Sequence, residues 1–461
     1  MGYEPKIRFF VIDKKTNPMV EANIKIIEEL KEFLKIINTD SELRKLFTNK
    51  ASDFTRNRKL TYNRTVFLII NMLKRSLSIE IQNFFDNCIS GNLSCTKSAL
   101  SIQRKKLKPL FFEVWNRLLV DCFYNYYGDK VKKWNGFLLI AVDGSTINLV
   151  DKQEVKNHFG THGNHLGEVP MAGIMKFYDV LNKITVFSKI HPIKIGEKSI
   201  VAQHIESIPE QSLSIYDRGF ASYSLMYLLI HQEKTKHFVM RCKQGFNKEV
   251  SDFMLSCDDD KVINLGPNYR AIHKMKEYGF KVFLHTTIPI RMIKVVLETG
   301  ETEVLLTNLY DSGKYKKEIF KTLYFMRWKI ETSYNHDKNV LQLGEFSGHT
   351  LWSIEQDFYA TTFVSNLQSI IEKQCESYLE IKNKIRKHDY QINRTLSIGS
   401  MKNKIVALLL TEQPKVVLLE LQNLFQRHLE PIRMDRNYER RKSKIRQSGK
   451  YKSVTNYKRA I

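Results

Sequence analysis

The spacing of apolar residues divides the chain into helical and extended stretches. From Glu21 to about Tyr127 apolar residues recur every three or four positions, which predicts an all-α region. The stretch 134–150 is instead a run of apolar and β-branched residues, typical of a strand buried on both faces and interrupted at Asp143-Gly144-Ser145. We predict further strands at 172–179, 183–190 and 213–216. An amphipathic helix is predicted between the second and third of these, at 197–208. The pattern therefore predicts a mixed α/β core behind a helical N-terminal region.

The second half of the chain returns to a helical period after another extended region. Strand patterns dominate from about 237 to 308 and include the run at 281–290. The helical period resumes at about Tyr315 and continues, with short breaks, to about His428. We expect the extended region to be a β-rich insertion between two parts of the α/β core.

Within this second helical region, four chemically unlike side chains stand at helical spacings. At about 100° per residue, Tyr324, Arg327, Glu331 and Lys338 would project from one narrow stripe of a single helix. A carboxylate flanked by an arginine, a lysine and a phenol suits a site that binds a divalent metal and a phosphodiester together. The alternative is a solvated helix face on which Arg327 and Glu331 pair at i,i+4.

The net charge points to a polyanionic partner. Lys and Arg outnumber Asp and Glu by 73 to 49, and many phosphate contacts are favoured by counterion release, so nucleic acid is the expected partner. The six cysteines form no CxxC pair, which argues against a zinc module or a disulfide framework. The N-terminus lacks a signal-peptide pattern and no run is long enough to cross a bilayer, so we expect a soluble cytoplasmic protein with no membrane partner.

Other polar clusters leave alternatives open. The histidines of HFGTHGNH, which are His158, His162 and His165, have metal-like spacing. No cysteine or second histidine pair supports zinc, so we expect a polar loop near DNA. A short helix at 96–107 would expose Gln103, Arg104, Lys105 and Lys106 to a DNA groove, or be only a basic solvated helix. The basic tail at 433–461 is either a DNA contact or a disordered arm.

Three acidic residues fit one catalytic site. Asp143 and Asp217 stand at the predicted carboxyl ends of strands, and Glu331 lies on the helix that follows the insertion. Their convergence would form a hard-oxygen site for two Mg²⁺ or Mn²⁺ ions. Taken singly, each aspartate could instead cap a turn or a helix. Arg218, beside the second aspartate, would contact a phosphate or pair with a carboxylate.

These residues carry a family resemblance. Asp143 in AVDGS, Asp217 in YDRGF and the spacing Tyr324-x2-Arg327-x3-Glu331-x6-Lys338 resemble the DDE transposases of bacterial insertion sequences, in the subgroup with that Tyr-Arg-Glu-Lys spacing. The likeness extends over most of the chain through DFTRNRKLT, KSALSIQRKKL, LGEFSGHT, QDFYA and NYKRAI. It implies an RNase H-like core interrupted by a mainly β insertion.

The resemblance also implies roles and a layout. Asp143, Asp217 and Glu331 would hold two Mg²⁺ (or Mn²⁺) ions, while Tyr324, Arg327 and Lys338 would hold terminal phosphates of the transposon end. The protein would bind the inverted repeats of its element as a homodimer on double-stranded DNA and carry out cut-and-paste transposition. The expected parts are a helical DNA-binding domain (1–130), the core (131–235 and 313–372), the insertion (236–312), and a C-terminal helical region with a basic tail (373–461).

One departure from the family pattern concerns the hairpin step. Well-studied members flip a base with aromatic residues that include a tryptophan in the insertion. Here all four tryptophans lie outside 236–312, so a stacking role would fall to a residue such as Tyr269, Tyr278 or Phe280. Two rival functions remain: a non-catalytic or domesticated DNA-binding relative, and an RNase H-like nuclease.

Overall fold

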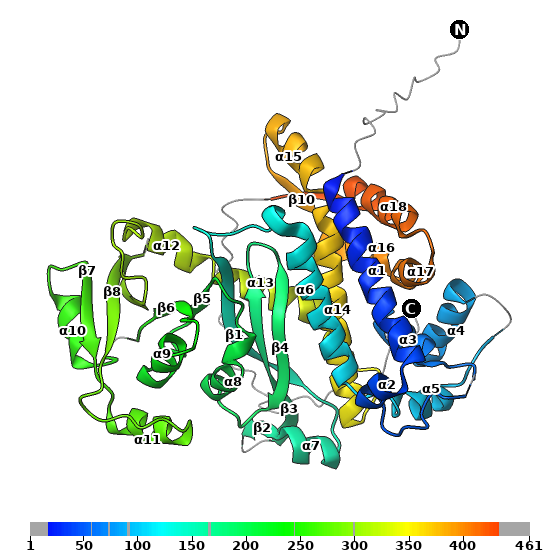
Figure 1. The fold of residues 1–461 in the computed structure, drawn as a ribbon, viewed down its shortest axis with the longest axis horizontal. Helices are drawn as coiled ribbons and strands as arrows, with labels where there is room; N and C mark the ends of the chain where they lie inside the picture. The colour runs from blue at the N-terminus through cyan, green and yellow to red at the C-terminus, as the bar shows by residue number, and fades with distance from the viewer. Residues whose placement is uncertain are drawn as a thin grey trace, which may run out of the picture.

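A computed structural model describes residues 17–432 except 57, 72–73, 90–92, 165–166, 244 and 298–299. The fold is mixed α/β, as the sequence predicts: a long twisted sheet lies between a large helical region and a smaller group of helices (Figure 1). The tail at 433–461 lies outside the described residues, so its expected DNA contact stays a prediction. None of the helices in the described ranges combines the length and apolar character needed to span a bilayer.

The predicted N-terminal helices are present and pack on one side of the sheet. They are α1 (Pro18–Thr39), α2 (Ser41–Phe47), α3 (Tyr62–Ile70), α4 (Leu77–Cys88), α5 (Lys97–Arg104) and α6 (Leu110–Tyr127). Three of them, α1, α3 and α6, pack against α14 (Leu351–Lys373), which is buried along nearly its whole length. Trp115 on α6 stacks on Phe363 of α14 with ring centroids 4.1 Å apart. Large aromatic contacts of this kind make the helical region and the sheet share one core.

The prediction that the helix at 96–107 exposes a basic face is wrong for two of its residues. α5 forms, and Lys105 is exposed, but Gln103 and Arg104 are buried. Gln103 donates to the carbonyl of Leu60, and Arg104 reaches α14, where it pairs with Asp357 at 2.9 Å. Tertiary contacts that the local pattern does not encode therefore remove both residues from the surface.

The sheet is continuous from the core into the region predicted as an insertion. Its order is β2-β3-β1-β5-β6-β9-β8-β7, with β4 paired to β3. The bounds are β1 (Leu138–Asn148), β2 (Thr161–Asn164), β3 (Gly167–Asp179), β4 (Ile184–Pro192), β5 (Ser212–Tyr216), β6 (His237–Arg241), β7 (Asp260–Leu265), β8 (Ile288–Val296) and β9 (Thr302–Thr307). Because β6 pairs with both β5 and β9, the strands of 236–312 prolong the core sheet.

Helices flank this sheet and complete the chain. Between the strands lie α7 (Gln153–Phe159), α8 (Glu197–Gln203), α9 (Tyr223–Ile230), α10 (Lys248–Leu255) and α11 (Tyr269–Glu277). After β9 come α12 (Glu318–Phe325), α13 (Trp328–Asn335), the π-helical turn η3 (His336–Val340), α14, α15 (Glu376–Ile385), α16 (Arg394–Met401), α17 (Lys404–Leu410) and α18 (Pro414–Arg427). Short 3₁₀ turns η1 (Gly128–Lys130) and η2 (Ile205–Ser207) and a small pair, β10 (Tyr390–Ile392) and β11 (Leu429–Pro431), complete the elements.

Two local predictions in the β-rich region need correction. The run at 281–290 is a strand only from Ile288, since residues 281–287 form a loop. The region also contains α10 and α11, which sequence patterning assigned to no helix. Both helices begin at an asparagine whose side chain accepts a backbone N–H, Asn247 and Asn268.

Candidate active site

Adjacent strands bring the two aspartates together. β1 and β5 pair in parallel as far as Val142 opposite Tyr216, and Asp143 and Asp217 are the next residues on each strand. The predicted interruption of β1 at Asp143-Gly144-Ser145 is wrong, because antiparallel pairing with β3 carries β1 on to Asn148, with Asp143 opposite Lys176. Asp143 therefore lies within a strand, at the point where its parallel neighbour ends.

The segment from Tyr324 to Lys338 is not the single regular helix that was predicted. The backbone tightens between α12 and α13, where Arg327 N donates to Tyr324 O (3.0 Å) and Ile330 N to Arg327 O (3.1 Å). It then widens into the π turn η3, where Leu341 N donates to His336 O (3.0 Å). A spacing of about 100° per residue does not hold through such junctions, and π turns are frequent at functional sites.

Buried polar contacts fix this segment over β1. Lys176 on β3 forms a buried ion pair with Asp337 in the π turn and also donates to Ser333 Oγ (2.8 Å). The Tyr334 hydroxyl donates to the backbone carbonyl of Asp143 (2.8 Å). Lys338 Nζ donates to Ser145 Oγ (2.6 Å). Together, these contacts hold α13 and η3 against the part of β1 that carries Asp143.

Arg327 links the third acid to the first. Its Nη2 donates to Glu331 Oε1 at 3.0 Å, and its Nη1 lies 3.7 Å from Asp143 Oδ2. The guanidinium group is almost fully buried, yet its Nε has no hydrogen-bond partner in the described structure. The Tyr324 hydroxyl lies 3.4 Å from Asp217 Oδ1. Tyr324 and Arg327 thus lie beside the two aspartates near the end of β5. Glu331 is connected to them through Arg327, and Lys338 contacts β1 two residues beyond Asp143.

Arg218 stands apart from this group. Its side chain is exposed and forms no ion pair with a carboxylate of any described residue. Only its backbone N–H reaches the site, as a donor to the carboxylate of Asp217. The predicted phosphate-binding role of Arg218 stays a prediction.

Two further charged residues belong to the site and were not found from sequence. Arg241, at the end of β6, pairs with Asp217 Oδ1 at 2.9 Å and with Glu303 on β9. Glu197, the first residue of α8, lies so close to Gly144 that a Cβ there would be 2.0 Å from Glu197 Oε1. Gly144 therefore permits a fourth carboxylate to approach Asp143. No motif marks Arg241 or Glu197, although Glu197 follows a glycine at a predicted helix start.

The two aspartates have opposite pKa shifts. Burial raises the pKa of Asp143 to about 6, although Arg327 and the Gly144 N–H act to lower it, and Glu197 and Asp217 add smaller increases. Burial also acts to raise the pKa of Asp217, but the Arg218 N–H and the guanidinium groups of Arg241 and Arg327 outweigh it, and that pKa is lowered. Negative charge near Asp143 is therefore incompletely neutralised by the protein.

The residues fit a divalent cation by donor type and charge. Carboxylate oxygens are the ligands that Mg²⁺ and Mn²⁺ prefer, and a cation would stabilise the charged form of Asp143, which burial disfavours. In the side-chain arrangement of the described ranges, no three His, Cys, Asp or Glu residues are grouped closely enough to hold a metal. Arg327 lies between Asp143 and Glu331 in this arrangement.

The histidine segment does not form the polar loop that was expected. His158 ends up on α7 and His162 on β2, so this segment is a helix and a strand where we expected a polar loop. His165 lies outside the described residues.

Comparison with known proteins places the chain in a family. The family model described as "Transposase DDE domain" matches residues 134–367, just over half of the chain. The transposase InsG of insertion sequence element IS4 from Escherichia coli K12 is 22% identical over 322 residues, which are 68% of this chain and 70% of InsG. InsZ of the same organism is 22% identical over 120 residues, or 25% of this chain and 40% of InsZ.

A solved structure shows a weaker likeness. The piggyBac transposase synaptic complex with hairpin DNA, determined by cryo-EM, aligns with a TM-score of 0.40 and 11% identity over 88% of this chain and 85% of that chain. A TM-score this low does not establish a common fold. The family-level prediction is confirmed by the sequence matches, while the Tyr-Arg-Glu-Lys subgroup stays a prediction. The chain belongs to the DDE transposase family, whose members are enzymes that act on DNA.

Proposed function

We propose that the protein binds the terminal inverted repeats of its own insertion sequence and cuts and joins DNA there, in cut-and-paste transposition. The observation that carries the proposal is that Asp143 and Asp217 are neighbours on adjacent strands, and that Arg327 lies between Asp143 and Glu331. The strand order β4-β3-β1-β5-β6, with β3 antiparallel to both neighbours, supports the RNase H-like core that the family resemblance implies.

In this proposal, Asp143, Asp217 and Glu331 hold two Mg²⁺ (or Mn²⁺) ions. When bound, such ions activate the attacking water or 3′-hydroxyl and stabilise the leaving oxygen. The protein's own groups supply position and charge. Arg327 has an unused Nε donor, and Tyr324 and Lys338 carry a hydroxyl and an ammonium at the same site, so these three side chains can orient phosphates of the transposon end.

The remaining parts of the chain would recognise and pair the DNA. The helical N-terminal domain at 1–130 would read the inverted repeat, and two protomers would bring two ends together. Support for a DNA partner comes from the net charge of +24. The dimer rests on family resemblance and on the need to join two ends.

The test uses the full chain, Mg²⁺ and a labelled duplex carrying the sequence that flanks the reading frame. Asp217→Asn should bind this duplex and leave it uncut, because it keeps the side-chain shape and loses the anionic ligand. The matched control is Asp258→Asn, which changes an exposed aspartate outside the site and should cut and join normally. Chelation of the metal should stop cutting in the wild type and leave binding intact.

Each other outcome points elsewhere. Normal cutting by Asp217→Asn would remove the assignment of the site. A wild-type protein that shifts the duplex without cutting it would be a non-catalytic DNA-binding relative. Cutting of unrelated branched DNA or of an RNA–DNA hybrid, with no joined product, would identify an RNase H-like nuclease.

A further inference from the structure

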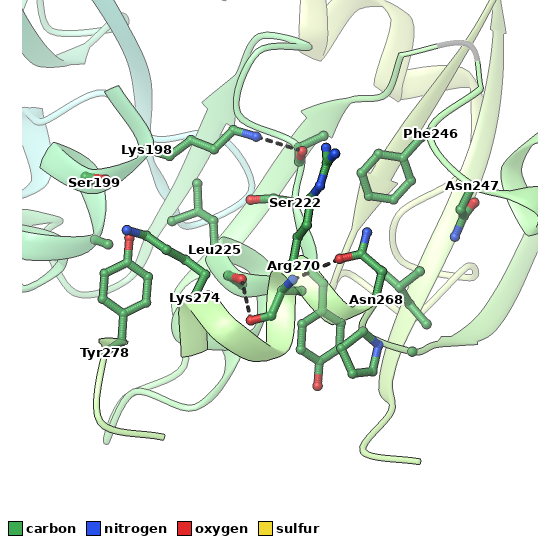
Figure 2. Close-up of a pocket in the computed structure, with 18 of the residues that line it drawn as sticks. Lys198, Ser199, Ser222, Leu225, Phe246, Asn247, Asn268, Arg270, Lys274 and Tyr278 are labelled. Atoms are coloured by element: carbon green, nitrogen blue, oxygen red, sulfur yellow. Dashed lines mark hydrogen bonds between the residues drawn. The ribbon is translucent and has the colours of Figure 1, made fainter. Parts of the chain in front are cut away.

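A cavity of about 540 Å³ lies between the α/β core and the outer strands and helices of 236–312. The core side is formed by the start of α8 and the start of α9, and the outer side by the starts of α10 and α11 (Figure 2). Its size falls within the range of about 300–1,000 Å³ that is usual for pockets that bind small ligands. It can therefore hold a group larger than a single ion.

The cavity is next to the candidate active site along the chain and in space. Lys198 and Ala221 both line it. Lys198 directly follows Glu197, whose carboxylate approaches Gly144, and Ala221 lies in the loop that leaves Asp217. Lys198 Nζ donates to the carbonyl of Ala221 (3.3 Å), which joins these two segments at the cavity wall. A strand of DNA at the candidate active site would have this cavity beside it.

The charged side chains around the cavity are mainly cationic. They comprise three cations and one carboxylate: Lys198, Arg270, Lys274 and Glu249. Lys274 already pairs with Glu277 at 2.6 Å. Arg270 is exposed, forms no ion pair with any described residue, and extends from α11 into the cavity toward the segment that carries Ser222 (Figure 2). Burial lowers the pKa of Lys198, and the neighbouring Lys243 lowers it further.

The first turn of α9 adds a second feature that favours an anion. Tyr223, Ser224 and Leu225 line the cavity, and no side chain caps the N–H groups at this helix start. Ser222 stands at the N-cap position, but its hydroxyl donates to the carbonyl of Phe220 (3.2 Å) instead. By contrast, Asn247 caps α10 and Asn268 caps α11. Uncapped N–H groups at a helix start bind phosphate and carboxylate groups well.

We propose that this cavity binds one phosphodiester group of a DNA strand that passes beside the scissile bond. Arg270 and Lys198 would pair with the phosphate, the first turn of α9 would donate to it, and Phe246 and Tyr278 would offer apolar surface to the attached sugar. The identity of the anion as DNA rests on the proposed function. The location and charge of the site do not.

The experiment measures how the affinity of the full chain for the flanking-sequence duplex depends on salt, without Mg²⁺. Arg270→Ala should bind more weakly at low salt, and the slope of log affinity against log salt should fall by about 1, as for the loss of one phosphate contact. Arg270→Lys should keep the slope, and Arg270→Glu should bind more weakly than Arg270→Ala. The matched control is Lys276→Ala, an exposed lysine on the same helix that does not line the cavity.

The result that would overturn the proposal is an unchanged affinity and slope in both Arg270→Ala and Arg270→Glu, or an equal loss in Lys276→Ala. The binding measurement needs no catalysis, so it separates this proposal from the proposed function. If the protein never cuts the duplex but shows the Arg270 effect, the proposed phosphate site stands and the proposed transposition mechanism is wrong. If the protein cuts and joins normally but shows no Arg270 effect, the transposition mechanism stands and the proposed phosphate site is wrong.

Discussion

Two buried arginines in this protein are surrounded in opposite ways. Arg104 uses every side-chain nitrogen: Nε donates to Gln356 at 2.8 Å, Nη1 to Ser347 at 2.6 Å, and Nη2 to Asp357 at 2.9 Å. Arg327 makes one hydrogen bond, to Glu331, lies 3.7 Å from Asp143, and has an Nε with no hydrogen-bond partner in the described structure. The first arrangement is complete without a ligand, and the second has donor capacity left for one.

The carboxylates that face these two arginines, Asp357 and Asp143, have pKa shifts of opposite direction. Burial acts to raise the pKa of Asp357, but Arg104, Lys74 and the Ser347 donors outweigh it, so the pKa is lowered. Burial raises the pKa of Asp143 to about 6 despite Arg327. A satisfied network stabilises the fold, whereas the incompletely satisfied group at Asp143 lies where the family resemblance locates catalysis.

The largest effect on stability is expected at the satisfied cluster. Arg104→Met should lower the free energy of unfolding by about 3–5 kcal/mol, because it leaves Asp357 buried without its cation. Chemical denaturation of the full chain measures this loss. Lys105→Met, at the exposed neighbouring position, is the control and should stay within about 0.5 kcal/mol of the wild type. Equal stability of Arg104→Met and the wild type would contradict the contrast between the two arginines.

At the second arginine we expect the loss to fall on activity. Arg327→Gln should lower the free energy of unfolding by only about 1 kcal/mol, since one hydrogen bond to a partly exposed carboxylate is lost. Its rate of end cleavage should fall by about 100-fold, as when a preorganised donor is removed from a phosphate or oxyanion site. Single-turnover cleavage with Mg²⁺ measures this rate, with exposed Lys321→Gln on α12 as the control. If Arg327→Gln lost much stability but cleaved normally, Arg327 would have a structural role like that of Arg104.

The pKa of Asp357 predicts a smaller, pH-dependent effect. Because that pKa is lowered in the folded state, its contribution to stability is complete above the ordinary value of 3.8 and is lost as the pH falls below it. As the pH falls below about 4, the wild type should therefore lose stability more steeply than Asp357→Asn. Denaturation at several pH values gives the two slopes. Equal slopes for the two proteins would show that the partners of Asp357 do not stabilise its charged form in the folded state.

Arg218 should give the smallest effect. Since its exposed side chain has no ion pair among the described residues, Arg218→Ala should change the free energy of unfolding by less than about 0.5 kcal/mol. Any loss in DNA affinity should be visible at low salt and vanish at high salt, as expected for a screened surface charge. A loss that persists at high salt would indicate a direct, buried contact in the complex.

Elements with a strong local pattern could be predicted from the sequence. The hairpin β3–β4, with its turn at Leu181-Asn182-Lys183, and the buried strand β5 formed as expected. Asp217 follows the end of β5 as expected, beside Asp143 on β1. The joining of Glu331 to these two aspartates in one metal site stays a prediction.

Several of the misses involve long-range contacts. β1 passes through Asp143-Gly144-Ser145 because β3 pairs with it, and pairing partners are not encoded locally. Arg104 looks like a surface cation until α14 is packed against it. Arg241 and Glu197 reach the site from a strand and a helix that no motif connects to the acids. Charge and periodicity could not reveal these neighbours, since they depend on the assembled sheet.

The unbroken sheet has a mechanical consequence. Because β6 pairs with β5 on one side and β9 on the other, the outer strands cannot swing on a loop hinge without bending the sheet that carries Asp143 and Asp217. Arg241 strengthens this connection, since it grips Asp217 on the core side and Glu303 on β9. A displacement of the outer strands would therefore also move the strands that carry Asp143 and Asp217.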